Sequence, residues 1–353
     1  MRSELTFKSF LSQLGVGESL SLKLPPDLLS KYVFSRVGVK DPDVLVGPSY
    51  GEDAAIIRVG KKLLVVHCDP ITGAVENIGW LAVHIACNDI AVRGAKPRWV
   101  LPIIYLPFGT SEEAIDKITR QIDKATKELN IMVVGGHTEY TYGLDRVMIA
   151  MTAMGVCEGE KYIITGGAKP GDLVLMTKAV AIEGTSILAS DFEELLKEKG
   201  VPPNIITRAK EFVREISVVK EALLLSKVGV NSMHDPTEGG VVAGLAEIAY
   251  ASKVLIRIWE SKIPIRPETE VICKALEVDP LKLISSGVLL ATASPEATEE
   301  GISLLREHGI KCKVIGEVME GEGLAVVRKS GTVEEYEAYV EDELLRIWRE
   351  STH

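Results

Sequence analysis

The sequence lacks several of the motifs that identify common enzyme classes. Its five cysteines form no C-x-x-C pair, so neither a zinc site nor a disulfide framework is expected. It contains no lysine-bearing P-loop of the form G-x-x-x-x-G-K-[ST], so a nucleotide enzyme with this sequence would hold phosphate mainly through metal. The six scattered histidines form no recognisable Ser/His/Asp triad, and the catalytic residues stay unknown at this point.

Long apolar runs are also missing. No run approaches the roughly 20 residues that span a bilayer, and residues 1–5 do not begin a signal-peptide pattern, so a cytoplasmic protein is expected. The net charge of −10 disfavours a nucleic-acid surface, which needs clustered Lys and Arg, but it does not exclude ATP held through metal. A chain of 353 residues, 46% of them hydrophobic, has enough material for about two globular domains.

Apolar, β-branched runs alternate with helical patterns, which predicts an α/β or α+β architecture. The helical segment 112–130 carries one apolar stripe, and Thr110 with Glu113 would form a capping box at its start. The predicted strands are 63–67, 100–106, 131–134, 147–155, 173–177, 254–258, 288–292 and 324–327.

A stretch rich in glycine, at 166–172, predicts a domain boundary. We therefore expect an N-terminal domain over 1–165 and a C-terminal domain over 166–332. A terminal helix or tail would follow over 333–353, with a helical apolar face across 333–349.

Four aspartates lie in motifs that suit a ligand site, because hard carboxylate oxygens bind Mg²⁺ ions that carry a polyphosphate. They are Asp53 in Gly-Glu-Asp-Ala-Ala, Asp69 after an apolar run, Asp89 within the apolar helical segment 78–94, and Asp235 at the start of Asp-Pro-Thr-Glu-Gly-Gly.

Each aspartate also has a structural interpretation that the residues alone leave open. Asp53 could sit in a surface turn, and Asp69 could form a turn or a helix cap. Asp89 could pair with Arg93 at i+4, and Asp235 could cap the helix that follows it.

Two glycine pairs could let phosphate approach the backbone. Gly135 and Gly136 follow a predicted strand and could present N–H groups, with His137 adding a polar contact, although a lone histidine is more often structural. Gly239 and Gly240 would open the N-terminus of a helix, where the dipole favours an anion. Thr237, which precedes this second pair, could cap the same helix or contact the ligand.

These motifs, in this order, resemble the aminoimidazole ribonucleotide synthetase (PurM-like) superfamily, over about residues 47 to 330. Within it, the run from Asp235 to Gly240 is most similar to the hydrogenase-maturation family HypE. The resemblance implies a two-domain fold in which the N-terminal sheets of two subunits pair into a barrel-like dimer core, with Mg²⁺–ATP between the domains. It assigns the metal to Asp53, Asp69, Asp89 and Asp235, and part of the nucleotide site to Asn88 and to Gly135, Gly136, His137 and Thr138.

The sequence departs from three members of this superfamily. HypE modifies a cysteine at its own C-terminus, whereas residues 347–353 here contain none, so that reaction on its own tail is not expected. Selenophosphate synthetase uses a reactive Cys or selenocysteine near its N-terminus, and residues 1–50 have no cysteine. Thiamine-monophosphate kinase usually has Asp after its Gly-Gly pair, where this chain has His137.

The leading hypothesis is a HypE-like, homodimeric enzyme that binds Mg²⁺–ATP and activates or phosphorylates an unidentified small substrate. This hypothesis includes a role in hydrogenase maturation with a maturation partner protein. One alternative is a small-molecule kinase of the thiamine-monophosphate type. The other is a nucleotide-binding scaffold without catalytic activity.

Overall fold

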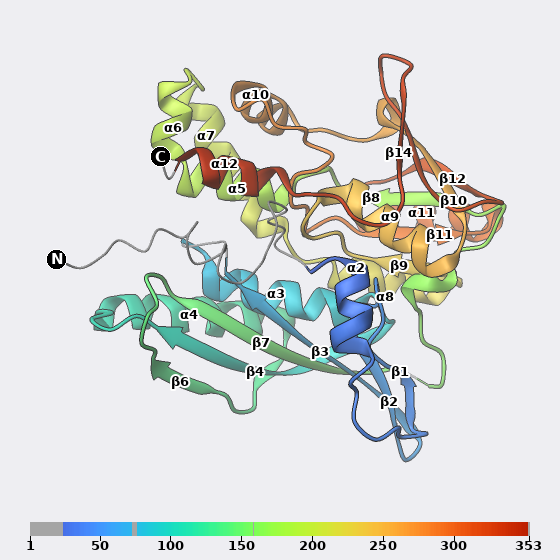
Figure 1. Cartoon of the computed structure of the whole chain (residues 1–353), viewed down its shortest axis with the longest axis horizontal. Helices are drawn as coiled ribbons and strands as arrows, with labels where there is room; N and C mark the ends of the chain where they lie inside the picture. Colours follow the sequence, from blue (N-terminus) through green and yellow to red (C-terminus); the bar gives the residue numbers. More distant parts are fainter. Residues whose placement is uncertain (1–23, 73–75, 158, 352–353) are drawn as a thin grey trace.

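The computed structural model describes residues 24–72, 76–157 and 159–351. Two sheets of seven strands each lie in separate halves of the molecule, and helices fill the space between them (Figure 1). The strands of the first sheet fall within residues 44–157, and those of the second within residues 173–336. The mixed α/β architecture expected from the alternating pattern is therefore confirmed.

The first sheet has the strand order β1-β2-β3-β7-β4-β5, and β6 also pairs with β4. Its neighbours are antiparallel, except that β4 runs parallel to β5 and β6. Within the described residues of one chain this sheet is open and does not close into a barrel. The strands are β1 (Val44–Val46), β2 (Ala55–Val59), β3 (Lys62–Ile71), β4 (Ala95–Leu106), β5 (Met132–Val133), β6 (His137–Tyr140) and β7 (Met148–Cys157).

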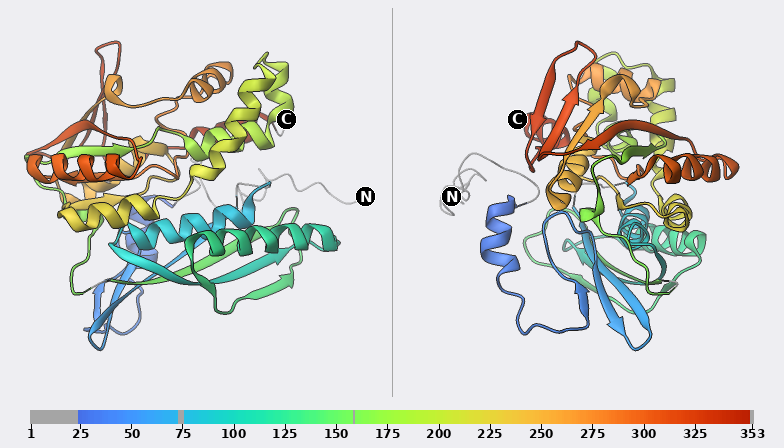
Figure 2. Two further views of the ribbon diagram at one scale, coloured as in Figure 1. Left: turned by 180° about the vertical axis from the view of Figure 1, so that it is seen from behind. Right: turned by 90° about the vertical axis from the view of Figure 1, so that its right-hand side faces the viewer.

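Helices α3 (Ile78–Ala91) and α4 (Glu112–Leu129) cover the face of the first sheet that points towards the second half (Figure 2). All fourteen residues of α3 are buried, because the helix is packed between the sheet, α4 and the second half. The amphipathic pattern of α4 is confirmed, but its predicted cap is wrong. Ser111 rather than Thr110 is the N-cap, and its hydroxyl accepts a hydrogen bond from the Ala114 N–H.

The second sheet has the order β14-β13-β10-β12-β8-β11-β9, in which only β10 and β13 are parallel neighbours among the described strands. Its strands are β8 (Leu173–Thr177), β9 (Ser232–His234), β10 (Leu255–Trp259), β11 (Leu290–Ala293), β12 (Cys312–Met319), β13 (Gly323–Val327) and β14 (Val333–Tyr336). Its helices are α5 (Ile182–Asp191), α6 (Glu193–Glu198), α7 (Pro203–Lys210), α8 (Val219–Val228), α9 (Gly240–Ser252), α10 (Pro267–Ala275), α11 (Pro295–Glu307) and α12 (Glu343–Ser351).

The predicted continuous helix over 333–349 is wrong in its first part. Val333–Tyr336 forms β14, the edge strand of the second sheet, because its side chains alternate between exposed and half-buried positions against β13. The apolar periodicity is helical only from Glu343, where α12 begins. Within the residues that the structure describes, no helix is both long enough and apolar enough to cross a membrane.

The contact between α3 and α4 depends on Gly79. A Cβ at this position would lie 2.5 Å from the Ile118 carbonyl oxygen and 3.0 Å from Gln121 Cβ. We expect Gly79→Ala to lower the free energy of unfolding by about 1–3 kcal/mol, because the two helices must move apart. Urea titration measures this change. Gly47→Ala is the control, because its nearest contact would be an ordinary 3.6 Å, and equal losses in both variants would contradict the packing argument.

Candidate functional site

The structure brings three of the four predicted aspartates together where the two halves meet. Asp53 comes from the loop before β2, Asp89 from α3 and Asp235 from the residue after β9. One carboxylate oxygen from each lies within 4.8 Å of the others. Asp69 lies beside them, inside β3 rather than after its end, and forms a second group of the same size with Asp89 and His67.

Arg93, directly after α3, holds Asp53 in place. Its guanidinium donates to Glu52 Oε2 at 2.7 Å and to Asp53 Oδ2 at 2.8 Å, and also to Thr165 Oγ1 and the Met233 carbonyl of the second half. The side chain of Arg93 is completely buried. The alternative pairing of Arg93 with Asp89 is therefore wrong, because four other acceptors surround the guanidinium.

His234 supports Asp53 from the other side. Its Nδ1 lies 2.8 Å from Asp53 Oδ2 and its Nε2 lies 2.8 Å from Glu247 Oε2. Burial alone would lower the pKa of His234, but the charges and hydrogen bonds of Asp53 and Glu247 raise it to about 10. The ring is therefore a cation at neutral pH, and both of its nitrogens donate.

Asp89 and Asp235 ionise less readily than free aspartates, because they are buried among other acidic groups. Burial, and then the charges of neighbouring aspartates, raise the pKa of each well above its ordinary value. Asp89 Oδ2 and both side-chain oxygens of Asp235 are buried and make no hydrogen bond with the described part of the chain. A divalent cation fits this site, because it would satisfy these oxygens and offset their mutual repulsion.

His67 lies next to the same oxygens. Its Nε2 is 3.3 Å from Asp89 Oδ2 and 3.8 Å from Asp69 Oδ1. Burial opposes protonation, but the hydrogen bond and charge of Asp69 bring the net pKa of His67 above its usual value. Its position two residues before Asp69 on a strand puts both side chains on one face, a signal that sequence reasoning missed.

Asn88 has a local structural role. Its amide donates to the Ile216 carbonyl, and its oxygen accepts from the Val218 N–H, so α3 is joined to the loop before α8. The Asn88 side chain is fully buried, and backbone groups of the protein occupy both its amide nitrogen and its amide oxygen.

The Gly135–Thr138 motif is not brought to the aspartates within one chain. His137 and Thr138 lie on exposed β6, which is separated from β3 by β4 and β7. Neighbouring strands lie about 4.8 Å apart, so the three steps from β6 through β4 and β7 to β3 separate these residues from Asp69 by roughly 14 Å. Gly136 permits a close approach to β4, since a Cβ there would lie 2.2 Å from the Pro102 carbonyl oxygen.

Thr237, Gly239 and Gly240 lie at the start of α9, close to Asp235. The N-cap of α9 is Gly239, in a left-handed conformation, so neither Asp235 nor Thr237 caps this helix through its side chain. A Cβ on Gly240 would lie 2.5 Å from the Leu281 carbonyl oxygen, and one on Gly239 would lie 2.7 Å from that of Val340. Both glycines thus make room for the protein's own backbone.

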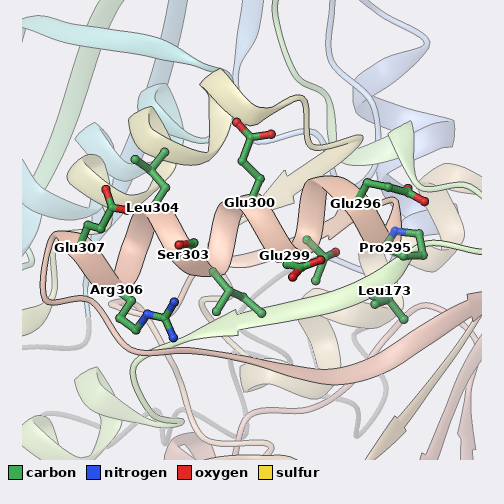
Figure 3. A pocket seen from close by; sticks show the side chains of 11 residues that line it. Leu173, Pro295, Glu296, Glu299, Glu300, Ser303, Leu304, Arg306 and Glu307 are labelled. Carbon is green, nitrogen blue, oxygen red and sulfur yellow. The ribbon is translucent and has the colours of Figure 1, made fainter.

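The hollows near the aspartates are small compared with one elsewhere. A cavity of about 40 Å³ lies beside Asp69 and Thr237. A much larger groove, of about 970 Å³, runs along α11, where glutamate side chains project from the helix (Figure 3). None of the predicted site residues lines that groove. The aspartates therefore lie away from this groove, at the boundary between the two halves.

Sequence reasoning also missed the residues that position the aspartates. These residues are Glu52, Arg93, His234 and Glu247, and their partners are distant in sequence. Arg93 was weighed only as a neighbour of Asp89 on the same helix, since residue spacing carries no information about Asp53 or the Met233 carbonyl.

Two family models match the chain. The AIR synthase related protein N-terminal domain matches residues 51–157, and the corresponding C-terminal domain matches residues 169–329. A putative hydrogenase expression/formation protein of Methanocaldococcus jannaschii is 30% identical over 83% of this chain and 87% of its own length. The carbamoyl dehydratase HypE of Rhizobium leguminosarum bv. viciae is 28% identical over 76% of this chain and 77% of its own.

Solved structures share the fold, which confirms the predicted two-domain PurM-like architecture. HypE in its complex with HypF superposes with a TM-score of 0.71, at 23% identity, over 88% of this chain and 99% of that one. HypE with ATP gives 0.67 at 22% identity, over 91% and 96%. The kinase ThiL, bound to AMPPCP and TMP, gives 0.68 at 22% identity, over 87% and 92%.

Replacing Arg93 tests whether its ion pairs organise the site. We expect Arg93→Met to lower the free energy of unfolding by about 3–5 kcal/mol, because Glu52 and Asp53 would stay buried without their guanidinium counter-ion. Chemical denaturation measures the loss. Arg58→Met is the control, because Arg58 faces Asp43 at 3.9 Å on the surface and should contribute under about 1 kcal/mol. A loss from Arg93→Met as small as that of the control would contradict this role.

The charge of His234 predicts a dependence of stability on pH. Its folded-state pKa of about 10 exceeds the usual 6.5, so its contribution is complete below pH 6.5 and is lost as pH rises towards 10. We expect the difference in melting temperature between wild type and His234→Gln to shrink across this range. Thermal melts in EDTA measure it. A difference that stays constant would show that His234 is uncharged in the folded protein.

Proposed function

The chain belongs to the AIR synthase related protein family, and from this premise we propose that it is a HypE-like, ATP-dependent enzyme. It binds Mg²⁺–ATP where its two halves meet, and it activates or phosphorylates a small acceptor molecule. By analogy with its named relatives, it would act in hydrogenase maturation.

The observation that carries this proposal is the convergence of Asp53, Asp89 and Asp235 from both halves of the chain. Three buried oxygens of Asp89 and Asp235 make no hydrogen bond with any described residue. A bound Mg²⁺ would neutralise charge on the nucleotide phosphates, which is the main contribution of metal in phosphoryl transfer. Asp69, with an exposed edge beside Asp89, would complete the ligand set.

Within this site the protein's residues hold charge in fixed positions. Arg93 and His234 keep Asp53 ionised, since His234 and Arg93 lower its pKa although burial acts to raise it. His67 Nε2 lies 3.3 Å from Asp89 Oδ2, and the hydrogen bond and charge of Asp69 raise the pKa of His67 against the effect of burial, which favours its charged form. Such preorganised charge stabilises a transition state without reorganisation during the reaction.

The homodimer expected from the resemblance is part of the same proposal. The face of the first sheet away from α3 carries half-buried apolar side chains, including Leu101, Ile103, Tyr105 and Met154. A second copy packed on this face would bury them and form the barrel-like core. It would also bring a partner's Gly135–Thr138 segment towards the nucleotide. A HypF-like maturation partner is a further proposal, motivated by the HypE–HypF complex.

The thiamine-monophosphate type of kinase remains the second candidate, because the ThiL fold superposes as well as that of HypE. The product separates the two reactions. A kinase leaves phosphate on the acceptor, whereas an activating enzyme releases inorganic phosphate after the second step. A scaffold would release no ADP when acceptors are added.

Substituting the cluster aspartates tests the nucleotide site. We expect Asp89→Asn and Asp235→Asn each to weaken Mg²⁺–ATP binding at least tenfold, or about 1.4 kcal/mol, because each removes a metal ligand. Calorimetric titration of ATP with and without Mg²⁺ measures this loss. Asp116→Asn on the exposed face of α4 is the control. Unchanged affinity in both Asp89→Asn and Asp235→Asn would contradict the assignment of these aspartates as metal ligands.

A further inference from the structure

The imidazole of His67 brings a nitrogen ligand to the edge of the aspartate cluster. Its Nε2 lies 3.3 Å from Asp89 Oδ2 and 3.8 Å from Asp69 Oδ1. One ligand atom from each of these three residues lies within 4.8 Å of the other two. Ligand atoms held about 2.0–2.2 Å from one tetrahedral ion are about 3.3–3.6 Å apart, so these side chains need only small shifts to share an ion.

The three side chains all come from the first half of the molecule. His67 and Asp69 are two residues apart on β3, an inner strand between β2 and β7, so both project from the face that α3 covers. Asp89 reaches the same point from α3. This group is therefore complete within the first half, whereas the group of Asp53, Asp89 and Asp235 needs a residue from the second half.

The oxygen of Asp89 that lies nearest His67 lacks a hydrogen-bond donor. Asp89 Oδ2 is buried and makes no hydrogen bond with the described residues, so the 3.3 Å approach of His67 Nε2 does not have hydrogen-bond geometry. A buried acceptor without a donor opposes folding, and a cation between the two atoms would satisfy both. The side chains of His67 and Asp69 are 23% and 29% exposed, so an ion can enter from solvent and keep water ligands.

The mixture of nitrogen and oxygen ligands limits the kind of ion. Mg²⁺ and Ca²⁺ take oxygen ligands, whereas imidazole suits Zn²⁺, Ni²⁺ and related transition-metal ions. The neighbouring group of Asp53, Asp89 and Asp235 offers oxygen alone. The two groups therefore present different ligand chemistry, although they share Asp89.

We propose that His67, Asp69 and Asp89 form a second metal site, which binds a transition-metal ion of the Zn²⁺, Co²⁺ or Ni²⁺ type in preference to Mg²⁺. This site goes beyond the proposed function, because it needs neither nucleotide nor the second half of the chain. Asp69 and Asp89 each have two carboxylate oxygens, so each can contact this ion and the Mg²⁺ of the nucleotide at the same time. With three protein ligands, the ion keeps an open position for water or for an oxygen of the acceptor.

Titration of the full-length protein with Co²⁺, in the absence of nucleotide, tests this second metal site directly. We expect calorimetry to show tighter binding of Co²⁺ than of Mg²⁺, and the visible absorption of bound Co²⁺ to report a ligand set that contains nitrogen. His67→Gln should weaken Co²⁺ binding at least about tenfold, because even the loss of a residue that only supports a metal ligand has an effect of that size. His308→Gln, at an exposed histidine that ends α11, is the control and should bind Co²⁺ as wild type does.

Further measurements separate this site from the nucleotide site. Asp69→Asn should weaken Co²⁺ binding, whereas Asp235→Asn, which lies outside the group, should leave it nearly unchanged. In wild type, Zn²⁺ should move the ring ¹⁵N signal of His67, a readout that does not depend on the folding of any variant. Equal Co²⁺ affinity in wild type and His67→Gln, Mg²⁺ binding as tight as that of Co²⁺, or a His67 ring signal that Zn²⁺ leaves in place would each overturn the second metal site. His67 would then serve only as a counter-ion for the two carboxylates.

Discussion

The buried guanidinium of Arg93 is the interaction on which the rest of the site depends. Arg93 lies just beyond the C-terminal end of α3 in the first half. Its guanidinium donates hydrogen bonds to Glu52, Asp53, Thr165 and the Met233 carbonyl. Placing a cation here is costly in desolvation, and the four acceptors of its two terminal nitrogens offset that cost. The same bonds fix the position of Asp53 and join the first sheet to β9. Domain packing and ligand geometry therefore share one set of contacts.

More acidic side chains are buried around this centre than Arg93 and His234 can pair with. Arg93 and His234 are committed to Asp53, while Asp89 and Asp235 are left with raised pKa values and open oxygens. A fold selected for stability alone would replace these groups, since repulsion between buried carboxylates opposes folding. The arrangement is understandable if a cation binds there and the folding cost is offset when nucleotide and metal arrive.

Much of the fold could be predicted from local patterns. The amphipathic stripe of α4 and the apolar runs of β3, β4 and β7 each specify one element, and all four elements were found. The terminal segment was misjudged because the i, i+3 spacing of Val333 and Tyr336 fits one helical face, whereas in a strand the two side chains lie on opposite faces, and only pairing with β13 makes the segment a strand. The Thr110 cap failed for a similar local reason, since Ser111 is an equally good cap one residue later.

The site was predictable only in part. Acidic motifs identified Asp53, Asp69, Asp89 and Asp235 because carboxylates beside glycines and in apolar helices are conspicuous in a sequence. The residues that hold these aspartates in place lie elsewhere in the chain. His234, for example, bonds to both Asp53 and Glu247, and such long-range pairs leave no local signal in the sequence. The most direct test of the central claim is anomalous diffraction from Mn²⁺ in crystals grown with a non-hydrolysable ATP analogue. The account predicts a metal peak within about 2–2.4 Å of Asp89 and Asp235 oxygens. A nucleotide and metal bound along α11, or at any place remote from these aspartates, would contradict it.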